Sequence, residues 1–352
     1  MAGGTDILFE RRGAAGVVIL NRPHALNAVS HDMVRSLAAK LADWASDSAV
    51  TRVIVTAAGD RAFSAGGDLR ALYDLGRAGR YEEALAFWRD EYRLNAMIKR
   101  YRKPYVALID GVVMGGGVGI SVHGSHPVAG DAFAFAMPEV GIGFFPDVGA
   151  TWFLPRLPGE LGTYCGLTGE RLDAADGVGS GIATHRVRSG MFPDLLNALC
   201  SAVPTEALLG AFAKPGGEGT VMGRRAWIDR FFRGDRVEDI LAELDAASAG
   251  SSGEAGFAAV TAATIRAKSP LSLKLTLAQL RRGRALDFDE CMRTEYRVVS
   301  RVVRGHDFYE GVRSVIIDKD QRPRWQPSSL AAVSAADVER HFAAVPDELD
   351  LA

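Results

Sequence analysis

Cysteine is scarce in this chain of 352 residues, and positive and negative side chains are nearly equal in number. Cys165, Cys200 and Cys291 lie far apart and form no Cys-x-x-Cys pair, so the pattern indicates neither a disulfide framework nor a zinc ribbon. Lys and Arg together number 41 and Asp and Glu 43, which leaves no positive field to attract nucleic acid or an anionic membrane. An acidic ligand therefore needs a local cluster of cations.

Long apolar runs are also absent. Stretches such as Tyr105–Ile109 are far too short to span a bilayer. Residues 1–10 contain neither a basic segment followed by an apolar run nor an Arg- and Ser-rich presequence. We therefore expect a soluble, cytoplasmic protein with reduced cysteines, without membrane or nucleic-acid partners.

Strand-like and helix-like segments alternate through the first half of the chain. Apolar runs predict strands at Val17–Leu20, Val53–Val55 and Tyr105–Ile109. Apolar residues at helical spacing predict one helix after Ser30, and the segment Tyr81–Arg102 is predicted to be a second helix. This alternation predicts an α/β domain with crossover connections. From about residue 160 the pattern becomes mainly helical, with a loop predicted near residues 248–256.

Two glycine-rich turns follow predicted strands, at Phe63–Asp68 and at Met114–Gly119. Glycine permits close backbone approach and positive φ, and a strand-to-helix turn presents free N–H groups. Two such turns can direct two donors at one oxygen, as stabilisation of an oxyanion requires. The alternative is that the glycines only permit tight turns or close helix packing. Neither a Walker loop nor a dinucleotide-binding fingerprint fits the second turn.

A third motif, Met137–Asp147, places Glu139 and Asp147 among apolar residues and glycines. A carboxylate in such surroundings is desolvated, which raises its pKa and suits it to proton transfer or nucleophilic attack. The alternative is a helix cap at Asp147 and a surface position for Glu139.

Together the three motifs resemble the crotonase (enoyl-CoA hydratase/isomerase) superfamily and, within it, the 3-hydroxyisobutyryl-CoA hydrolases. The matching strings are FSAGGDLRAL, KPYVALIDGVVMGGGVGISVHG, FAMPEVGIGFFPDVGATWFLPRLPG, GIATH, KSPLSLK, RGHDFYEGVRSVIIDKD and PRW. The resemblance implies an α/β fold with a ββα spiral core and a mainly α-helical C-terminal region. It places the core with the coenzyme A and catalytic site in residues 1–200. Residues 201–352 would cover the acyl pocket or mediate contacts in a homo-oligomer, a trimer or hexamer.

The resemblance also assigns roles to individual residues. The oxyanion hole would consist of the backbone N–H groups of Gly67 and Gly116, the catalytic pair of Glu139 and Asp147, and the substrate contacts of Glu91, Ala65, Gly66, Arg22 and Lys268. Arg22 and Lys268 are candidate contacts to the coenzyme A phosphates, with solvated surface cations as the alternative. No metal and no cofactor is implied, because coenzyme A is part of the substrate.

The implied activity is hydrolysis of 3-hydroxyisobutyryl-CoA, or of 3-hydroxypropionyl-CoA, in valine breakdown. Glu139 would attack the thioester or activate water. Hydratases of the superfamily carry a second glutamate where this chain has Gly119, so one of their two acid/base groups is missing here. The alternatives are an enoyl-CoA hydratase or isomerase of fatty-acid metabolism and a non-catalytic acyl-CoA-binding protein.

Overall fold

The computed structural model describes residues 6–351, so half of the segment searched for a targeting signal lies outside it. The chain divides into two compact units, each assembled from three stretches of sequence. Unit 1 comprises the described part of residues 1–68 with residues 90–136 and 171–223, and unit 2 comprises residues 69–89 and 137–170 with the described part of 224–352.

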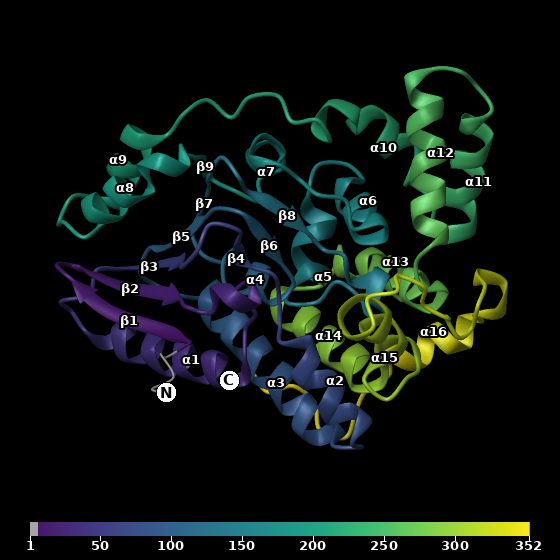
Figure 1. Cartoon of the computed structure of the whole chain (residues 1–352), viewed down its shortest axis with the longest axis horizontal. Helices are drawn as coiled ribbons and strands as arrows, with labels where there is room; N and C mark the ends of the chain where they lie inside the picture. Colours follow the sequence, from purple (N-terminus) through teal and green to yellow (C-terminus); the bar gives the residue numbers. More distant parts are fainter. Residues whose placement is uncertain (1–5, 352) are drawn as a thin grey trace. The chain divides into compact units, whose positions relative to one another are not determined.

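Unit 1 is built on two β-sheets (Figure 1). The larger has the spatial order β1 (Ile7–Arg12), β2 (Ala15–Leu20), β3 (Arg52–Ala57), β5 (Tyr105–Ile109), β7 (His126–Ala129) and β9 (His185–Arg186). Only β1 and β2 are antiparallel; the other neighbours are parallel. The smaller, parallel sheet contains β4 (Ala62–Ser64), β6 (Val112–Met114) and β8 (Ala134–Ala136). The central strands are continuous apolar runs, as is typical of buried parallel strands.

The helices of unit 1 lie between these strands in the chain, except for the last two, which follow β9. They are α1 (His31–Ser46), the second half of α3 (Tyr81–Lys99), α4 (Gly116–Gly119), α7 (Ala174–Ser180), α8 (Phe192–Leu199) and α9 (Thr205–Phe212). Helix α1 begins where predicted, because the Ser30 hydroxyl accepts a hydrogen bond from the Met33 amide. Helix α3 ends at Lys99, before the predicted end at Arg102. Residues 100–103 form a turn and bends instead, and Pro104 disfavours the helical conformation at the residue before it.

Unit 2 is helical over most of its described length, as predicted for the chain beyond residue 160. Its helices are α2 (Leu69–Arg77), the first half of α3, α5 (Ala150–Phe153), α6 (Leu161–Thr168), α10 (Arg225–Phe231), α11 (Val237–Ser248), α12 (Gly253–Arg266), α13 (Pro270–Gly283), α14 (Phe288–Val302), α15 (Asp307–Val312) and α16 (Ala335–Phe342). Helices α11 and α12 form a hairpin (Figure 1), whose loop falls within the predicted stretch 248–256.

Short helical turns complete the two units. The 3-10 turns are η1 (Pro23–Ala25), η2 (Glu139–Ile142), η3 (Leu154–Arg156), η4 (Ser189–Met191), η5 (Met222–Arg224) and η7 (Leu330–Ala332), and η6 (Arg313–Ile317) is a π-helical turn. Within unit 2, α13 packs against α5 and α6, α14 packs against α5, and α15 packs against η2. The contact of α15 with η2 holds the turn that carries Glu139, and α13 and α14 pack on the helix that follows Asp147. No helix of residues 6–351 is long and apolar enough to cross a membrane.

Candidate functional site

The two glycine-rich turns of unit 1 come together at Gly67 and Gly116. Gly66 has a φ of +108° and Gly115 a φ of +45°, a region that side-chain-bearing residues rarely adopt. A methyl group added to Gly116 would lie 3.3 Å from the Gly67 amide nitrogen. The predicted pair of glycines is therefore a close pair in space, and glycine is required at positions 66 and 115 to shape the turns.

Both amides of this pair remain available to a ligand. Among residues 6–351, no backbone carbonyl accepts a hydrogen bond from the amide of Gly67 or Gly116. The first turn is fixed on both sides by Val29, whose amide donates to the Gly66 carbonyl at 2.8 Å and whose carbonyl accepts from the Asp68 amide at 3.0 Å. Two neighbouring N–H groups without a backbone acceptor among these residues are compatible with the predicted oxyanion hole.

Ala65 extends the same turn. Its amide donates to the Leu26 carbonyl at 3.0 Å, which anchors the backbone that was predicted to lie against the adenine end of coenzyme A.

Glu91 lies at the glycine pair. The side chain comes from α3, is 2% exposed, and has its Oε1 only 2.5 Å from the position of a methyl group on Gly116. Its neighbour Asp90 bonds to His31 at 2.7 Å and to Arg35 at 2.9 Å, which ties α3 to α1. The predicted substrate-binding carboxylate is thus held directly beside the two amides.

Arg22 already forms a hydrogen bond and ion pairs within unit 1. Its guanidinium donates to the Ala28 carbonyl at 2.7 Å and forms ion pairs with Asp68 at 3.1 Å and Asp6 at 3.2 Å. Two carboxylates therefore compensate the positive charge. This arrangement favours a role in holding the loop before the first glycine turn over a role in binding phosphate.

In unit 2, Glu139 and Asp147 are both buried, with exposed fractions of 6% and 4%. Burial raises the pKa of Glu139 well above its ordinary value, and the negative charge of Asp147 raises it further. Glu139 Oε2 has no hydrogen-bond partner among the described residues. The alternative of a surface Glu139 is therefore wrong, and an unbonded, desolvated carboxylate oxygen is present instead.

Aromatic side chains surround the segment between the two carboxylates. Phe144 stacks on Phe145 with ring centroids 4.7 Å apart and on Trp88 at 5.7 Å, and it contacts Phe308 at 5.5 Å. These rings exclude water from their surroundings, which is consistent with the raised pKa of Glu139.

A further buried carboxylate near Asp147, that of Glu295, was not predicted from the sequence. This residue of α14 is fully buried and accepts hydrogen bonds from the amides of Gly149 and Thr151, both at 2.8 Å. Burial raises the pKa of Glu295 to about 8, and the charge of Asp147 contributes in the same direction. A signal was present in the sequence: Glu295 interrupts the apolar stripe formed by Cys291 and Val298.

Gln279 of α13 contacts the same loop on the other side of Asp147. Its Nε2 donates to the Pro146 carbonyl at 2.6 Å. Between these two anchors, Val148 has a φ of +52° and Gly149 a φ of +89°. Asp147 therefore sits in a backbone turn that is bonded on either side.

Lys268 follows α12 and lies beside η2. Its Nζ is 3.5 Å from the position of a methyl group on Gly141, two residues from Glu139. Burial lowers the pKa of Lys268, and the carboxylate of Glu170 opposes this effect. The lysine is thus a partly desolvated cation near the turn that bears Glu139.

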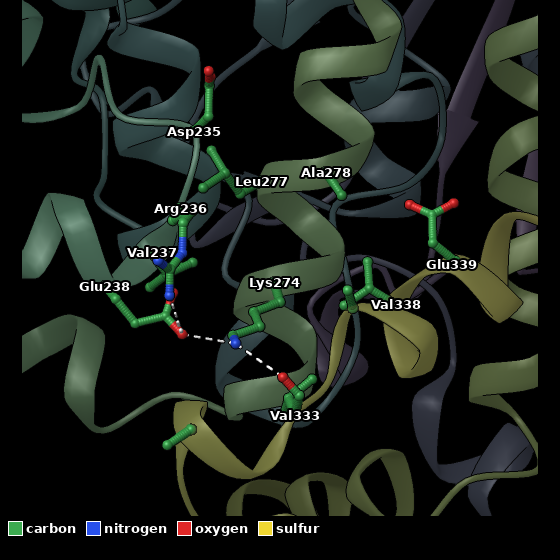
Figure 2. A pocket seen from close by; sticks show the side chains of 12 residues that line it. Asp235, Arg236, Val237, Glu238, Lys274, Leu277, Ala278, Val333, Val338 and Glu339 are labelled. Atoms are coloured by element: carbon green, nitrogen blue, oxygen red, sulfur yellow. Dashed lines mark hydrogen bonds and ion pairs between the residues drawn. The ribbon is translucent and has the colours of Figure 1, made fainter.

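A separate pocket of 730 Å³ in unit 2 contains none of the predicted site residues (Figure 2). It is lined by the start of α11, by α13 and by α16 with the segment before it. Its Lys274 forms an ion pair with Glu238 at 2.7 Å and donates to the Val333 carbonyl at 2.9 Å. Arg236, the other cation of the lining, lies 3.8 Å from the same glutamate, and Asp235 and Glu339 add two more carboxylates. Because acidic side chains outnumber basic ones in this lining, the pocket does not favour the phosphates of an acyl-CoA.

No group of three or more His, Cys, Asp or Glu side chains within residues 6–351 is arranged to hold a metal ion. The absence of a metal and of a cofactor stays a prediction.

Comparisons with known proteins agree with the sequence motifs. The model of the family described as "Enoyl-CoA hydratase/isomerase" matches residues 15–342. A zebrafish (Danio rerio) protein named "3-hydroxyisobutyryl-CoA hydrolase, mitochondrial" is 44% identical over 358 residues, covering 99% of this chain and 92% of the relative. The human protein of the same name is 41% identical, covering 96% of this chain and 88% of the relative.

Two solved bacterial structures are similar over nearly their whole length. A protein described as a carnitinyl-CoA dehydratase from Mycobacterium thermoresistibile has a TM-score of 0.93 and 42% identity, with 99% of both chains covered. A protein described as an enoyl-CoA hydratase from Rhodobacter sphaeroides has a TM-score of 0.91 and 38% identity, with 98% of this chain and 100% of the other covered. The predicted α/β fold is confirmed by these likenesses.

Proposed function

Because the chain belongs to the enoyl-CoA hydratase/isomerase family, we propose that it hydrolyses 3-hydroxyisobutyryl-CoA to the free hydroxy acid and coenzyme A. The observation that carries this proposal is the buried pair Glu139 and Asp147, in a chain that has Gly119 where hydratases have their second glutamate. The two vertebrate relatives named as hydrolases, each more than 40% identical, support the same activity. This substrate assigns the protein to valine breakdown.

The glycine pair would bind the thioester carbonyl oxygen. As a nucleophile adds to the carbonyl carbon, the oxygen gains negative charge and its hydrogen bonds to the Gly67 and Gly116 amides strengthen. Because the turns are already fixed, no reorganisation is needed when this charge develops. Such preorganised donors each contribute about 100- to 1,000-fold to rate. Glu91 would contact the bound substrate beside the same amides.

Glu139 would supply the reactive carboxylate. In one route it attacks the thioester carbon, the C–S bond breaks with release of coenzyme A, and water then cleaves the resulting mixed anhydride. In the other route it removes a proton from water, which attacks the thioester directly. Both routes need Glu139 in its ionised form. Asp147 would hydrogen-bond the substrate hydroxyl or relay a proton.

The coenzyme A moiety would contact the Ala65–Gly66 backbone at its adenine end and Lys268 at its phosphates. Lys268 is the stronger of the two predicted phosphate contacts, because the charge of Arg22 is compensated by Asp6 and Asp68.

A second candidate activity is hydration of an enoyl-CoA. It is favoured by the two solved relatives, which are described as a dehydratase and a hydratase. Against it, the position of the second glutamate is occupied by the buried Gly119. Adding water across a double bond needs a second group to move a proton, and a glycine provides none.

One assay separates these functions. The purified protein is given 3-hydroxyisobutyryl-CoA and crotonyl-CoA in parallel, and thiol release and loss of the enoyl absorbance are followed. Thiol release that is abolished in Glu139→Gln supports the hydrolase. Rapid hydration of crotonyl-CoA without thiol release would assign the hydratase activity, and binding of coenzyme A without either reaction would indicate a non-catalytic protein.

The cellular location and the oligomeric state of the protein do not follow from the proposed function. The zebrafish and human relatives are described as mitochondrial, so they do not support the cytoplasmic location predicted for this chain. That location and the predicted trimer or hexamer both stay predictions.

A further inference from the structure

The loop that carries Asp147 is bonded by side chains from two helices. On the N-terminal side, Gln279 of α13 donates to the Pro146 carbonyl at 2.6 Å. On the C-terminal side, Glu295 of α14 accepts from the amides of Gly149 and Thr151 at 2.8 Å each. Both Gln279 and Glu295 are fully buried. Asp147 is thus enclosed by three side-chain-to-backbone bonds within a span of six residues.

The backbone at this point is strained. Val148 has a φ of +52°, which is unfavourable for a β-branched residue. Such a conformation persists only where the surroundings impose it. The bonds from Gln279 and Glu295 flank Val148 on both sides, so they are placed to help impose it.

A glutamate suits this position for a geometric reason. Each of the two oxygens of Glu295 accepts one of the two amide N–H groups, and both oxygens keep lone pairs for this whether the group is ionised or protonated. A glutamine of the same shape would accept only one and would direct its NH₂ group at the other. Replacing Glu295 by glutamine would therefore change the hydrogen bonds to the loop, although the side chain would fill the same volume.

We propose that Glu295 and Gln279 are positioning residues, which hold the strained turn so that the Asp147 carboxylate is correctly placed for the reaction. This inference rests on the proposed function. Neither residue is required to touch the substrate. Misplacing a reacting group by about 1 Å can cost about 100-fold in rate, so the loss of either anchor is expected to be visible in turnover.

The charges of the loop and its anchor are coupled as well. The ionised Asp147 is one of the causes that raise the pKa of Glu295, which means that the two carboxylates are close enough to influence each other's protonation. The anchor is therefore electrostatically as well as geometrically connected to the proposed site.

The test measures kcat and KM for thiol release in Glu295→Gln, Glu295→Asp and Gln279→Leu. The matched control is Glu243→Gln, which removes one carboxylate from an exposed position on α11. We expect kcat to fall about 10- to 100-fold in Glu295→Gln and Gln279→Leu, with KM within about twofold. Glu295→Asp keeps two acceptor oxygens and should retain more activity than Glu295→Gln. The control should match the wild type.

Hydrogen exchange of the peptide containing residues 146–151 gives a second readout that does not depend on turnover. In Glu295→Gln one of the two amides, that of Gly149 or that of Thr151, loses its acceptor, and its exchange should accelerate by at least tenfold. If the wild type releases no thiol, the proposed hydrolase function fails while the exchange result still tests the anchoring of the turn.

Three outcomes would overturn the inference. The first is wild-type kcat in folded Glu295→Gln and Gln279→Leu. The second is a loss of activity that only follows the folded fraction measured by circular dichroism. The third is unchanged exchange at residues 146–151. If Glu295→Gln does not fold, Glu295→Asp and Gln279→Leu decide in the same way, since wild-type kcat in both would contradict the proposal.

Discussion

Glu91 and Gly116 are so close that a methyl group on Gly116 would lie 2.5 Å from Glu91 Oε1. That spacing leaves no room for a side chain at the turn that presents the Gly116 amide. Gly116→Ala must therefore displace either the glutamate or the turn. We expect thiol release to fall about 100-fold or more, as for the loss of one oxyanion donor.

The control for this prediction is Gly210→Ala, at an exposed site in α9 where an added methyl group meets nothing within 4 Å. This change should leave turnover intact and stabilise the helix slightly. Full activity of Gly116→Ala would remove the glycine pair from the mechanism.

Replacing Glu139 by Gln tests the proposed reactive carboxylate. Gln has nearly the same volume but neither attacks a thioester nor accepts a proton from water, so kcat should fall by about 100- to 10,000-fold. Binding of coenzyme A, measured by calorimetry, should stay within about threefold. Retention of more than a tenth of the wild-type turnover would show that another group performs the chemistry.

The pH dependence of kcat/KM should reflect the burial of Glu139. Because burial and Asp147 both raise the pKa of Glu139, activity is expected to rise with pH through an apparent pKa clearly above 4.5. Asp147→Asn removes the negative charge beside Glu139, so the rising part of the kcat/KM profile should shift to lower pH. The maximal rate should fall at the same time. A shift to higher pH in this variant would contradict the assigned coupling.

Glu295 should make the folded protein less stable as pH rises. Its folded-state pKa is about 8, whereas in the unfolded chain it is that of an ordinary glutamate, near 4.5. Between these values the folded protein holds a proton that the unfolded chain has lost. The contribution of Glu295 is therefore fully present below about pH 4.5 and is lost as pH rises toward 8.

The slope of this effect is at most about 1.4 kcal/mol per pH unit for one proton. Urea unfolding of the wild type and of Glu295→Gln at pH 5, 6, 7 and 8 measures it, and the variant should show the shallower decline. Parallel curves for the two proteins would argue against a raised pKa at this residue.

Arg22 and Lys268 should respond differently to neutralisation. Lys268→Met is expected to raise KM for an acyl-CoA about tenfold with little effect on kcat. Arg22→Met removes bonds to the Ala28 carbonyl and Asp68, so it should lower stability by about 1–3 kcal/mol and change KM less. If Arg22→Met raised KM and Lys268→Met mainly lowered stability, Arg22 would be the phosphate contact and Lys268 the structural cation.

The sequence predicted those elements whose pattern is local. Strand β5 occupies Tyr105–Ile109 as predicted, and α1 begins after Ser30, because apolar periodicity and a capping hydroxyl act within a few residues. The close pairing of Gly67 and Gly116 was also anticipated, although only through the family resemblance, since they are 49 positions apart in the chain.

Other features depend on distant partners and were not predictable in this way. The position of Glu295 on an apolar stripe marks it as unusual, yet its bonds to Gly149 and Thr151 join residues more than 140 positions apart. The ion pairs of Arg22 with Asp6 and Asp68 are of the same kind, and the bonds that flank Val148, whose φ is positive, come from side chains far away in the sequence.

The proposed donors at Gly67 and Gly116 are peptide N–H groups, and this affects how the activity can be lost by mutation. Almost every codon leaves a peptide N–H in place, proline being the exception, so a missense change seldom deletes the donor itself. Inactivating alleles at positions 66, 67, 115 and 116 are then expected to act through added bulk or altered backbone angles. A second-site change that restores space, rather than one that restores a functional group, is the kind of suppressor to be sought in a genetic selection.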